Sequence, residues 1–558
     1  MKKKKFSLVL TLVLALSVIV AACGNDESSS KKESGSEAAV QELRVLKSSE
    51  IPSMDSVMAT DATSFTILGN VNEGLYSLNE NNELVPAVAE GDPEVNEEGT
   101  EFTVTLKDGV EWANGDPVTA ADFVYAWQRA IDPENASPYG PYMMENKILG
   151  ATEITEAAAA GQAYDLNSLG VEAVDETKLV VKTASPMTVD FFKGLMAFGT
   201  FYPQNQAFVE AHGDKYATSA ETVLSNGPFK MTSWKGPTAT EWELEKNENY
   251  WDADNVSLTK IIFNVSKESQ SAVNAIEAGE ADITDKLSSD IVPQYEGDER
   301  MVSWLDPRIA WVKLNQENEA LANENIRRAI ATAFNKDDLV ENVLNNGSVA
   351  ANYAVPADFV KDADGKDFRD ANGDLLTYDA EKAKEYWAKG LEETGLTEVT
   401  LTLLGSDTDA AKKVDQYLKD QLEKNLEGLT VNIENVPFAV RIDREQKEDF
   451  DMVDSGWGPD FLDPITFSDL WVTDGLNNNQ NYSNAEYDSL IEQAQQTTDT
   501  AEKWAFLQKA EKILLEEDAG LAPVYQQAYN ILVSEKVEGF TYHSVGSEAS
   551  YKYITITE

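Results

Sequence analysis

The most restrictive feature of this sequence is a segment, residues 399–433, in which the spacing of apolar side chains changes twice. Apolar residues first alternate with polar ones, then recur every fourth position, then alternate again: Val399, Leu401 and Leu403; Val414, Leu418, Leu422 and Leu426; Val431 and Ile433. Alternation is typical of a strand, and a spacing of four is typical of one helix face. Two strands joined by a helix pair in parallel through a right-handed crossover. We therefore expect a parallel sheet in the C-terminal half.

Strand and helix patterns also occur elsewhere. Phe102, Val104 and Leu106 alternate with polar residues, and a helix follows that Thr119 caps and that ends at Asp132. One face of this helix carries Phe123, Trp127, Ala130 and Ile131. Further amphipathic helices are predicted at 272–277, 325–335 and 380–391. This mixture indicates α/β or α+β lobes.

The N-terminus has the pattern of a secretory signal. Four lysines, Lys2 to Lys5, precede an apolar run at 6–20, and Ala21, Ala22 and Cys23 follow. The run VAAC at 20–23 resembles the lipobox of bacterial lipoproteins, which implies removal of residues 1–22 and lipidation of Cys23. An ordinary signal peptide with a chance cysteine is the alternative. Residues 24–39 are almost wholly polar, so 23–41 is predicted to be a disordered tether.

Charge and composition exclude several classes of function. The chain has 98 Asp or Glu against 45 Lys or Arg, a formal charge of −53, which disfavours nucleic acid as a partner. One Cys and two His, His212 and His543, leave little for a disulfide, a metal site or His-based catalysis. No G-x-S-x-G elbow or P-loop occurs. A glycosidase-type carboxylate pair stays open, because such pairs are recognised in space rather than in sequence.

The segment at 450–464 is the first candidate for binding. A short strand-like run ends in a glycine-rich, aromatic and acidic loop, and loops at strand C-termini bind ligands in open α/β sheets. Gly456 and Gly458 would allow close approach of a ligand, Trp457 offers a flat apolar face, and Asp460 offers a carboxylate for a cation. A purely structural loop is the alternative. The aromatic cluster Trp457, Phe461, Phe467 and Trp471 is equally compatible with core packing.

The segment at 370–381 resembles a calcium loop only in part. Asp370, Asn372, Asp374 and Glu381 occupy ligand positions, but Leu375 stands where the sharp turn needs glycine. A polar surface turn before a helix capped by Asp379 is the better interpretation.

Several longer motifs, in order along the chain, carry a family resemblance. They are NEGLY at 72–76, VPAVA at 85–89, FTVTLKDGVEW at 102–112, NGDPVTAADFVYAW at 114–127, NGPF at 226–229, NYW at 249–251, AGEAD at 278–282 and NIRRA at 325–329. Together they resemble the signature of extracellular solute-binding proteins of the oligopeptide and dipeptide class, family 5. The resemblance covers nearly all of residues 43–558.

The resemblance implies a mixed α/β, bilobal fold of the periplasmic-binding-protein type II kind, with an extra domain in the N-terminal lobe. Lobe I would comprise 42–72, about 200–303 and about 528–558; the accessory domain about 73–199; and lobe II about 304–527. It also implies a peptide receptor that serves an ABC importer. Such a receptor is expected to have no catalytic residues and no cofactor, and to be a monomer. The predicted lipid anchor would hold it at the outer face of the cell membrane, which suggests a Gram-positive host, where there is no periplasm.

Single positions follow from the same resemblance. Asp460 matches the aspartate that pairs with the peptide's α-ammonium. Tyr139, Ala62 and the backbone from Gly456 to Gly458, which includes Trp457, match contacts to the peptide. The chain has Thr60 where the enteric oligopeptide binders have a glutamate contact, so the N-terminal side of the site is expected to differ.

Other functions stay open on the sequence. A receptor for one signalling peptide would have the same fold. A surface hydrolase of cell-wall glycans would use two of the many carboxylates, and an adhesin or wall-associated chaperone would use an open surface patch.

Overall fold

The computed structural model describes residues 40–362, 364–475 and 477–557. The predicted signal peptide, Cys23 and the tether up to residue 39 lie outside this range. Residues 40 to 558 form one compact unit, to which the description below refers. Within the described residues, no helix has the length and apolarity needed to cross a membrane.

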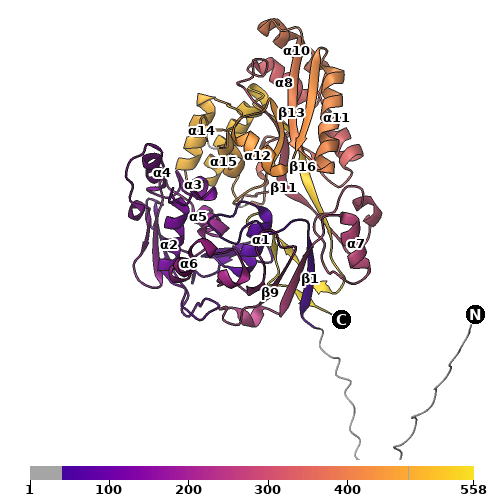
Figure 1. Ribbon diagram of the computed structural model, residues 1–558. Helices are drawn as coiled ribbons and strands as arrows, with labels where there is room; N and C mark the ends of the chain where they lie inside the picture. Colours follow the sequence, from indigo (N-terminus) through magenta and orange to yellow (C-terminus); the bar gives the residue numbers. More distant parts are fainter. Residues whose placement is uncertain (1–39, 363, 476, 558) are drawn as a thin grey trace, which may run out of the picture. The chain divides into compact units, whose positions relative to one another are not determined.

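A six-stranded mixed sheet dominates the C-terminal half (Figure 1). Its order is β12-β16-β11-β15-β13-β14. The strands are β11 (Met301–Leu314), β12 (Val349–Ala350), β13 (Val399–Ser406), β14 (Leu429–Val436), β15 (Met452–Trp457) and β16 (Leu521–Leu532). β13 runs parallel to β14 and to β15, whereas β11 pairs antiparallel to β15 and β16.

The predicted strand-helix-strand unit is confirmed. Helix α11 (Asp409–Asn425) connects β13 to β14, and its apolar stripe is buried. The sheet is parallel only in this part, because β11 and β16 enter it from distant segments of the chain and close its other side with antiparallel pairing. No local pattern around residue 400 could show that.

Helices cover this sheet. They are α8 (Glu324–Thr332), α9 (Lys336–Asp338), α10 (Ala380–Thr394), α12 (Phe438–Gln446), α13 (Ile465–Ser468), α14 (Ala485–Gln496) and α15 (Thr500–Lys512). The predicted helices at 325–335 and 380–391 correspond to α8 and α10, although α8 ends earlier, at Thr332. Asp379 caps α10 as expected, accepting a hydrogen bond from the Lys382 N–H at 3.1 Å.

A four-stranded sheet, of order β1-β10-β9-β8, lies below the first in the view of Figure 1. Its strands are β1 (Glu42–Lys47), β8 (Phe229–Ser233), β9 (Glu241–Lys246) and β10 (Lys260–Val265). β1 pairs in parallel with β10, although more than 200 residues separate them in the chain. Helix α7 (Ser269–Glu277), which includes the predicted helix at 272–277, packs its Val273 and Ile276 into a core with Leu46 of β1.

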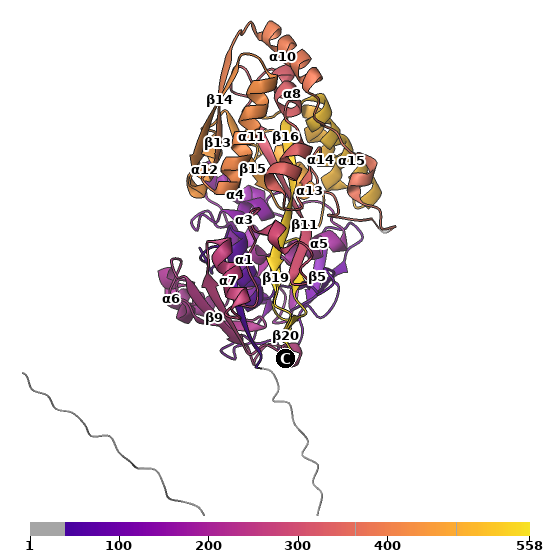
Figure 2. The ribbon, with the colours of Figure 1, turned by 90° about the vertical axis from the view of Figure 1, so that its right-hand side faces the viewer.

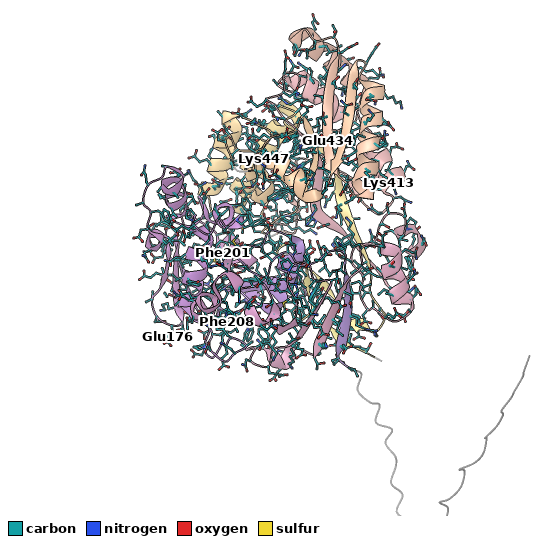
Figure 3. The ribbon with its side chains drawn as sticks, viewed as in Figure 1. Glu176, Phe201, Phe208, Lys413, Glu434 and Lys447 are labelled. Carbon is teal, nitrogen blue, oxygen red and sulfur yellow. The ribbon has the colours of Figure 1, made fainter. Side chains whose placement is uncertain are left out.

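A second four-stranded sheet lies within the N-terminal third. Its strands are β4 (Glu94–Val95), β5 (Glu101–Thr105), β6 (Val171–Ala173) and β7 (Lys178–Lys182). Helix α2 (Ala120–Ile131) follows β5, and Thr119 caps it with Asp122 in a capping box, which confirms both predicted elements. Trp127 of α2 packs edge-on against Phe201, which is labelled in Figure 3.

Shorter elements complete the described chain. They are α1 (Ala62–Val71), β2 (Tyr76–Leu78), β3 (Leu84–Pro86), α3 (Tyr139–Met144), α4 (Ala151–Ala159), α5 (Val189–Met196), α6 (Gln206–His212), β17 (Val537–Glu538), β18 (Thr541–Tyr542), β19 (Ala549–Ser550) and β20 (Thr555–Ile556).

Two long strands connect the upper and lower parts of this unit. β11 and β16 run side by side from the six-stranded sheet toward the lower strands, as Figure 2 shows. Their pairing is irregular between Leu305 and Ile309, so Asp306, Pro307 and Arg308 bulge out of the ladder. The bulge lies close to the predicted boundaries at about 304 and 528. The lobe boundaries themselves stay a prediction.

Candidate functional site

The candidate site begins at the carboxyl end of β15. This strand pairs with β11 through all six residues from Met452 to Trp457, but with β13 only at Met452 and Val453. The edge of Asp454 to Trp457 that faces β13 therefore has no strand partner among the described residues, and it lies where parallel strands of an open α/β sheet present their ligand-binding loops. An unpaired edge can accept an added strand.

Close packing requires glycine at position 456 of β15. A Cβ on Gly456 would stand 2.7 Å from the Ile309 carbonyl oxygen, which is backbone and cannot move aside. A Cβ on Gly458 would stand 2.9 Å from the Arg308 guanidinium, the end of a flexible side chain, which could shift. Glycine here lets β11 and Arg308 approach the loop, a reason that the sequence did not suggest, while their predicted contact with a ligand stays a prediction.

Asp460 is a buried carboxylate without a close counter-charge. Asp460 is only 7% exposed, and the hydroxyls of Tyr139 and Tyr142 lie close enough to its carboxyl group to hydrogen-bond with it. Burial raises the pKa of Asp460 to about 7, and the charge of Asp469 raises it further, whereas Tyr142, Lys147 and Arg308 lower it. An isolated buried charge is costly, so a cation at this point would be bound favourably.

Aromatic residues from α3 lie next to this carboxylate. The ring of Tyr142 meets Trp457 edge-on at 5.9 Å, and Tyr139 stacks on Phe198 at 5.8 Å. Burial raises the pKa of both phenols well above its ordinary value, and the charge of Asp460 raises it further. α3 and the loop after β15, more than 300 residues apart, thus form one site.

The buried polar atoms of this site have few protein partners. Trp457 Nε1 has no hydrogen-bond partner among the described residues, and the Tyr142 hydroxyl has only the Asp460 carboxyl group close by. Folded proteins rarely leave buried polar groups unpaired, and those that remain need an explanation, such as a ligand or water. A carboxylate, a phenol and an indole at one place are suited to a ligand that offers both donors and acceptors.

The start of α1 borders the site less directly. Phe65 of α1 packs on Tyr139 at 5.7 Å, and the charge of Asp61, which caps the helix, contributes to the raised pKa of Tyr139. Ala62 is the first residue of α1, and no contact with Asp460 is described for it. Thr60 is exposed. The roles of Ala62 and Thr60 stay predictions.

Four residues at the site were not predicted: Tyr142, Lys147, Arg308 and Asp469. Lys147 Nζ donates to the Tyr142 carbonyl at 3.1 Å, and Arg308 forms an ion pair with Glu548 at 3.4 Å. Burial raises the pKa of Asp469 to about 6. Tyr142 lies three positions after Tyr139 on the same short helix, so helical periodicity could have predicted that both face the site. No pattern in the sequence around Arg308 predicts its place at the site, because a bulge in β11 positions it there.

A cavity of about 70 Å³ opens beside Asp460 and Leu462. Its wall is apolar at Phe198 and Tyr202 and polar at Glu73 and Lys552. The Glu73 carboxylate accepts hydrogen bonds from the Tyr250 hydroxyl at 2.7 Å and from Trp251 Nε1 at 2.6 Å. The space next to the candidate carboxylate can therefore hold a small group of mixed polarity.

The other candidates have structural roles. Asn372 donates to Glu511 at 2.9 Å, and Asn352 donates to Asp374 at 3.3 Å, so the segment at 370–381 is a hydrogen-bonded turn. His543 is buried beside Asn82 at 2.7 Å, and burial lowers its pKa to about 4. Phe461, Phe467 and Trp471 are buried core residues. Across the residues that the structure describes, no group of His, Cys, Asp and Glu is arranged to hold a metal ion.

Comparison with known proteins decides the family. Residues 83–479 match the model of bacterial extracellular solute-binding proteins, family 5. This chain is a family 5 solute-binding protein. It is 33% identical to the dipeptide-binding protein of Lactococcus lactis subsp. cremoris (strain MG1363), over 98% of both chains. It is 32% identical to the oligopeptide-binding protein OppA of Bacillus subtilis (strain 168), over 96% of this chain and 97% of that one.

Solved structures agree with the family 5 assignment. Listeria monocytogenes OppA bound to peptide is 37% identical, with a TM-score of 0.82, over 93% of this chain and all of that one. The pheromone receptor PrgZ is 34% identical, with a TM-score of 0.83 and the same coverage. The predicted mixed α/β, periplasmic-binding-protein type II fold is therefore confirmed. Family 5 consists of solute-binding proteins rather than enzymes.

Proposed function

We propose that this protein captures peptides outside the cell and delivers them to an ABC importer, without catalysing a reaction. The observation that carries the proposal is Asp460, a buried carboxylate that forms no ion pair within the described residues and lies beside the open edge of β15. The names of the relatives support the proposal, since these proteins are called dipeptide-binding, oligopeptide-binding or a pheromone receptor.

The geometry suits the start of a peptide chain. The α-ammonium pairs with Asp460, and the peptide main chain adds to the free edge of Asp454 to Trp457 as a further strand. Main-chain hydrogen bonds of this kind do not depend on the peptide's sequence. Trp457, the backbone of Gly456 and Gly458, Tyr139 and the start of α1 at Ala62 complete the proposed site.

Contacts across the predicted lobe boundary suit a closing mechanism. Phe191 of α5 meets Phe461 edge-on at 5.3 Å, and Lys503 of α15 lies 4.4 Å from the centre of the Phe191 ring. The bulge in β11 is a suitable hinge, because β11 and β16 connect the predicted lobes there. A bound peptide would add contacts to both sides and favour the closed form.

The membrane attachment belongs to the same proposal. Cys23, outside the described residues, would carry the lipid and hold a monomeric receptor at the outer face of the membrane. This arrangement suits a Gram-positive host, which has no periplasm to retain a soluble receptor. Mass spectrometry of the mature N-terminus should find a diacylated Cys23; a free N-terminus elsewhere would contradict the anchor.

Calorimetry with a pool of tri- to hexapeptides tests the function. We expect heat of binding from the native protein and a loss of about 100-fold or more in affinity for Asp460→Asn, because a buried charge pair is removed. Asp420→Asn is the matched control, since Asp420 is exposed on α11. Absence of binding by the native protein, or equal binding by Asp460→Asn, would contradict the proposal.

A dedicated signalling-peptide receptor is the second candidate, supported by the similarity to the pheromone receptor PrgZ. Peptides that copurify with the protein separate the two functions. A heterogeneous mixture supports general peptide uptake, whereas one dominant sequence supports signalling.

A further inference from the structure

The cavity beside Asp460 has the size of one amino-acid side chain. Its lining includes Asp460 and Leu462 from the loop after β15, and its volume is about 70 Å³. A buried water needs about 10–15 Å³ of such a cavity, so about five waters, or a side chain of about four or five carbon-sized atoms, would fill this one. The cavity therefore matches a side chain of the size of leucine, isoleucine or methionine.

A glycine of α5 keeps part of this cavity open. Gly194 of α5, a helix labelled in Figure 1, belongs to the lining. Apart from the backbone of its own helix, the nearest atom that a Cβ on Gly194 would meet is Leu84 Cδ1, at 3.8 Å, which is ordinary van der Waals contact. Its φ is not positive, so neither packing nor backbone conformation requires glycine at this position. Glycine within a helix is less favourable than alanine. What the glycine does provide is space in the cavity.

Apolar side chains surround this space. They come from the β2–β3 hairpin, from the end of α5 and from the loop after β15, and they are Leu78, Leu84, Ala197, Phe198 and Leu462. Each methylene group that a ligand buries against such a wall strengthens binding by about fourfold. An apolar side chain that fills the cavity should therefore be bound more tightly than a small one.

The charged groups of the wall other than Asp460 already have partners. The Glu73 carboxylate accepts a hydrogen bond from the Tyr250 hydroxyl at 2.7 Å. Lys552 forms an ion pair with Asp252 at 2.7 Å. His543 is uncharged at neutral pH, because burial lowers its pKa to about 4. A charged ligand side chain would thus leave water without gaining a counter-charge, which is unfavourable. The cavity favours an uncharged side chain.

On the proposed function, the first residue of the peptide lies beside this cavity. Its α-ammonium pairs with Asp460, and the main chain leaves along the open edge of Asp454 to Trp457. The first side chain starts at the carbon that carries the ammonium, so it is within reach of the cavity that Asp460 lines. Each later residue lies about 3.4 Å farther along the edge. The first side chain is therefore the one that can enter.

We propose that this cavity is a specificity subsite for the first side chain of the peptide, and that Gly194 sets its depth. The subsite selects an uncharged side chain of the size of Leu, Ile or Met over Ala, and it disfavours Lys and Glu. This inference rests on the proposed function, because the pairing of Asp460 with the α-ammonium places the first residue at the cavity.

Calorimetry with peptides that differ at a single position tests the subsite. Peptides of one neutral sequence begin with Ala, Leu, Phe, Lys or Glu, and a second set carries the same residues at position two. At position one of the native protein's ligand, we expect Leu to bind about tenfold or more tighter than Ala, and Lys and Glu to bind no better than Ala. A preference for Leu at position two, and not at position one, would overturn the proposal.

Three variants attribute the preference to the cavity. Gly194→Leu fills it and should remove the preference for Leu over Ala. Leu84→Ala enlarges it and should increase the affinity for Phe relative to Leu. Gly91→Leu is the matched control and should keep the native preference, because a Cβ on Gly91 meets nothing within 4 Å and Gly91 does not line the cavity. A thermal melt of each variant checks that it is folded.

The outcomes separate this inference from the function beneath it. If no peptide binds the native protein, the proposed function fails. If peptides bind but Leu has no advantage at position one, or if folded Gly194→Leu keeps that advantage, the subsite is refuted and the function stands. Should Gly194→Leu not fold, Leu84→Ala decides, and the absence of a gain for Phe refutes the subsite.

Discussion

At the scale of single residues, the proposed role of Asp460 predicts how peptide binding depends on pH. Its pKa of about 7 in the free protein means that below pH 7 the carboxyl is mostly protonated and must lose a proton before it pairs with an ammonium. The raised pKa of Asp469, about 6, acts in the same direction. The α-ammonium of the peptide itself deprotonates near pH 8. The affinity should therefore be greatest between about pH 7 and 8 and fall on both sides.

We predict an affinity about tenfold weaker at pH 6 than at pH 7.5, because each pH unit below the pKa costs about tenfold. Calorimetry of one peptide from pH 5 to 9 measures the profile. Asp460→Asn should lose the acidic limb and keep weak, flat binding there. An affinity for the native protein that is constant from pH 5.5 to 7.5 would contradict the assignment.

A second residue-scale feature concerns stability alone. Arg369 pairs with Glu511 through the two terminal nitrogens of its guanidinium, Nη1 and Nη2, and the side chain of Glu511 also accepts hydrogen bonds from Asn372 and from the N–H of Val355. Removing one partner leaves a buried charge uncompensated. Glu511→Gln should lower the free energy of unfolding by about 3 to 5 kcal/mol, measured by urea denaturation. A loss below about 1 kcal/mol would show that the network relaxes around the change.

At the scale of elements, the strand-helix-strand unit of β13, α11 and β14 depends on one glycine. Gly405→Ala would push a methyl group into the Asp415 carboxylate, which Asn435 holds in place. We expect a loss of about 1 to 3 kcal/mol in the free energy of unfolding. Gly91→Ala is the control, because a Cβ there meets nothing within 4 Å. Equal effects of the two substitutions would contradict the packing argument.

The same unit shows which parts of the fold and of the candidate site could be predicted from the sequence. Its period of two, then four, then two follows from burial on one face, so β13, α11 and β14 were predictable, as were the capped helix after Thr119 and the loop with Asp460. Arg308 and Tyr142 were not, because their positions depend on the bulge in β11 and on α3 meeting a loop 300 residues away. The antiparallel partners β11 and β16 were missed for the same reason. Local spacing carries no information about such distant pairing.

At the scale of the whole described unit, β11 and β16 form the connection between its parts, and side chains tie the parts together elsewhere. Lys413 of α11, labelled in Figure 3, pairs with Asp290 at 3.0 Å beside the α7 region. Both side chains are partly exposed, and exposed pairs contribute about 0 to 1 kcal/mol. Closure should therefore depend on the ligand more than on such pairs.

Ligand binding should accordingly stabilise the fold as a whole. A peptide at 100 times its Kd should add about 2.7 kcal/mol to the free energy of unfolding and raise Tm. Differential scanning calorimetry with and without peptide measures this change. If the peptide binds but Tm does not change, the folded and unfolded chains bind it equally well. That result would exclude a preformed binding site.

The most direct test of the central claim compares one peptide with its N-acetylated form. If the Asp460 carboxylate holds the α-ammonium, acetylation at pH 7.5 should weaken binding to the native protein by about 100-fold or more, since it removes the charge that the buried carboxylate pairs with. Equal Kd values for the two forms would show that Asp460 does not hold the peptide's N-terminus.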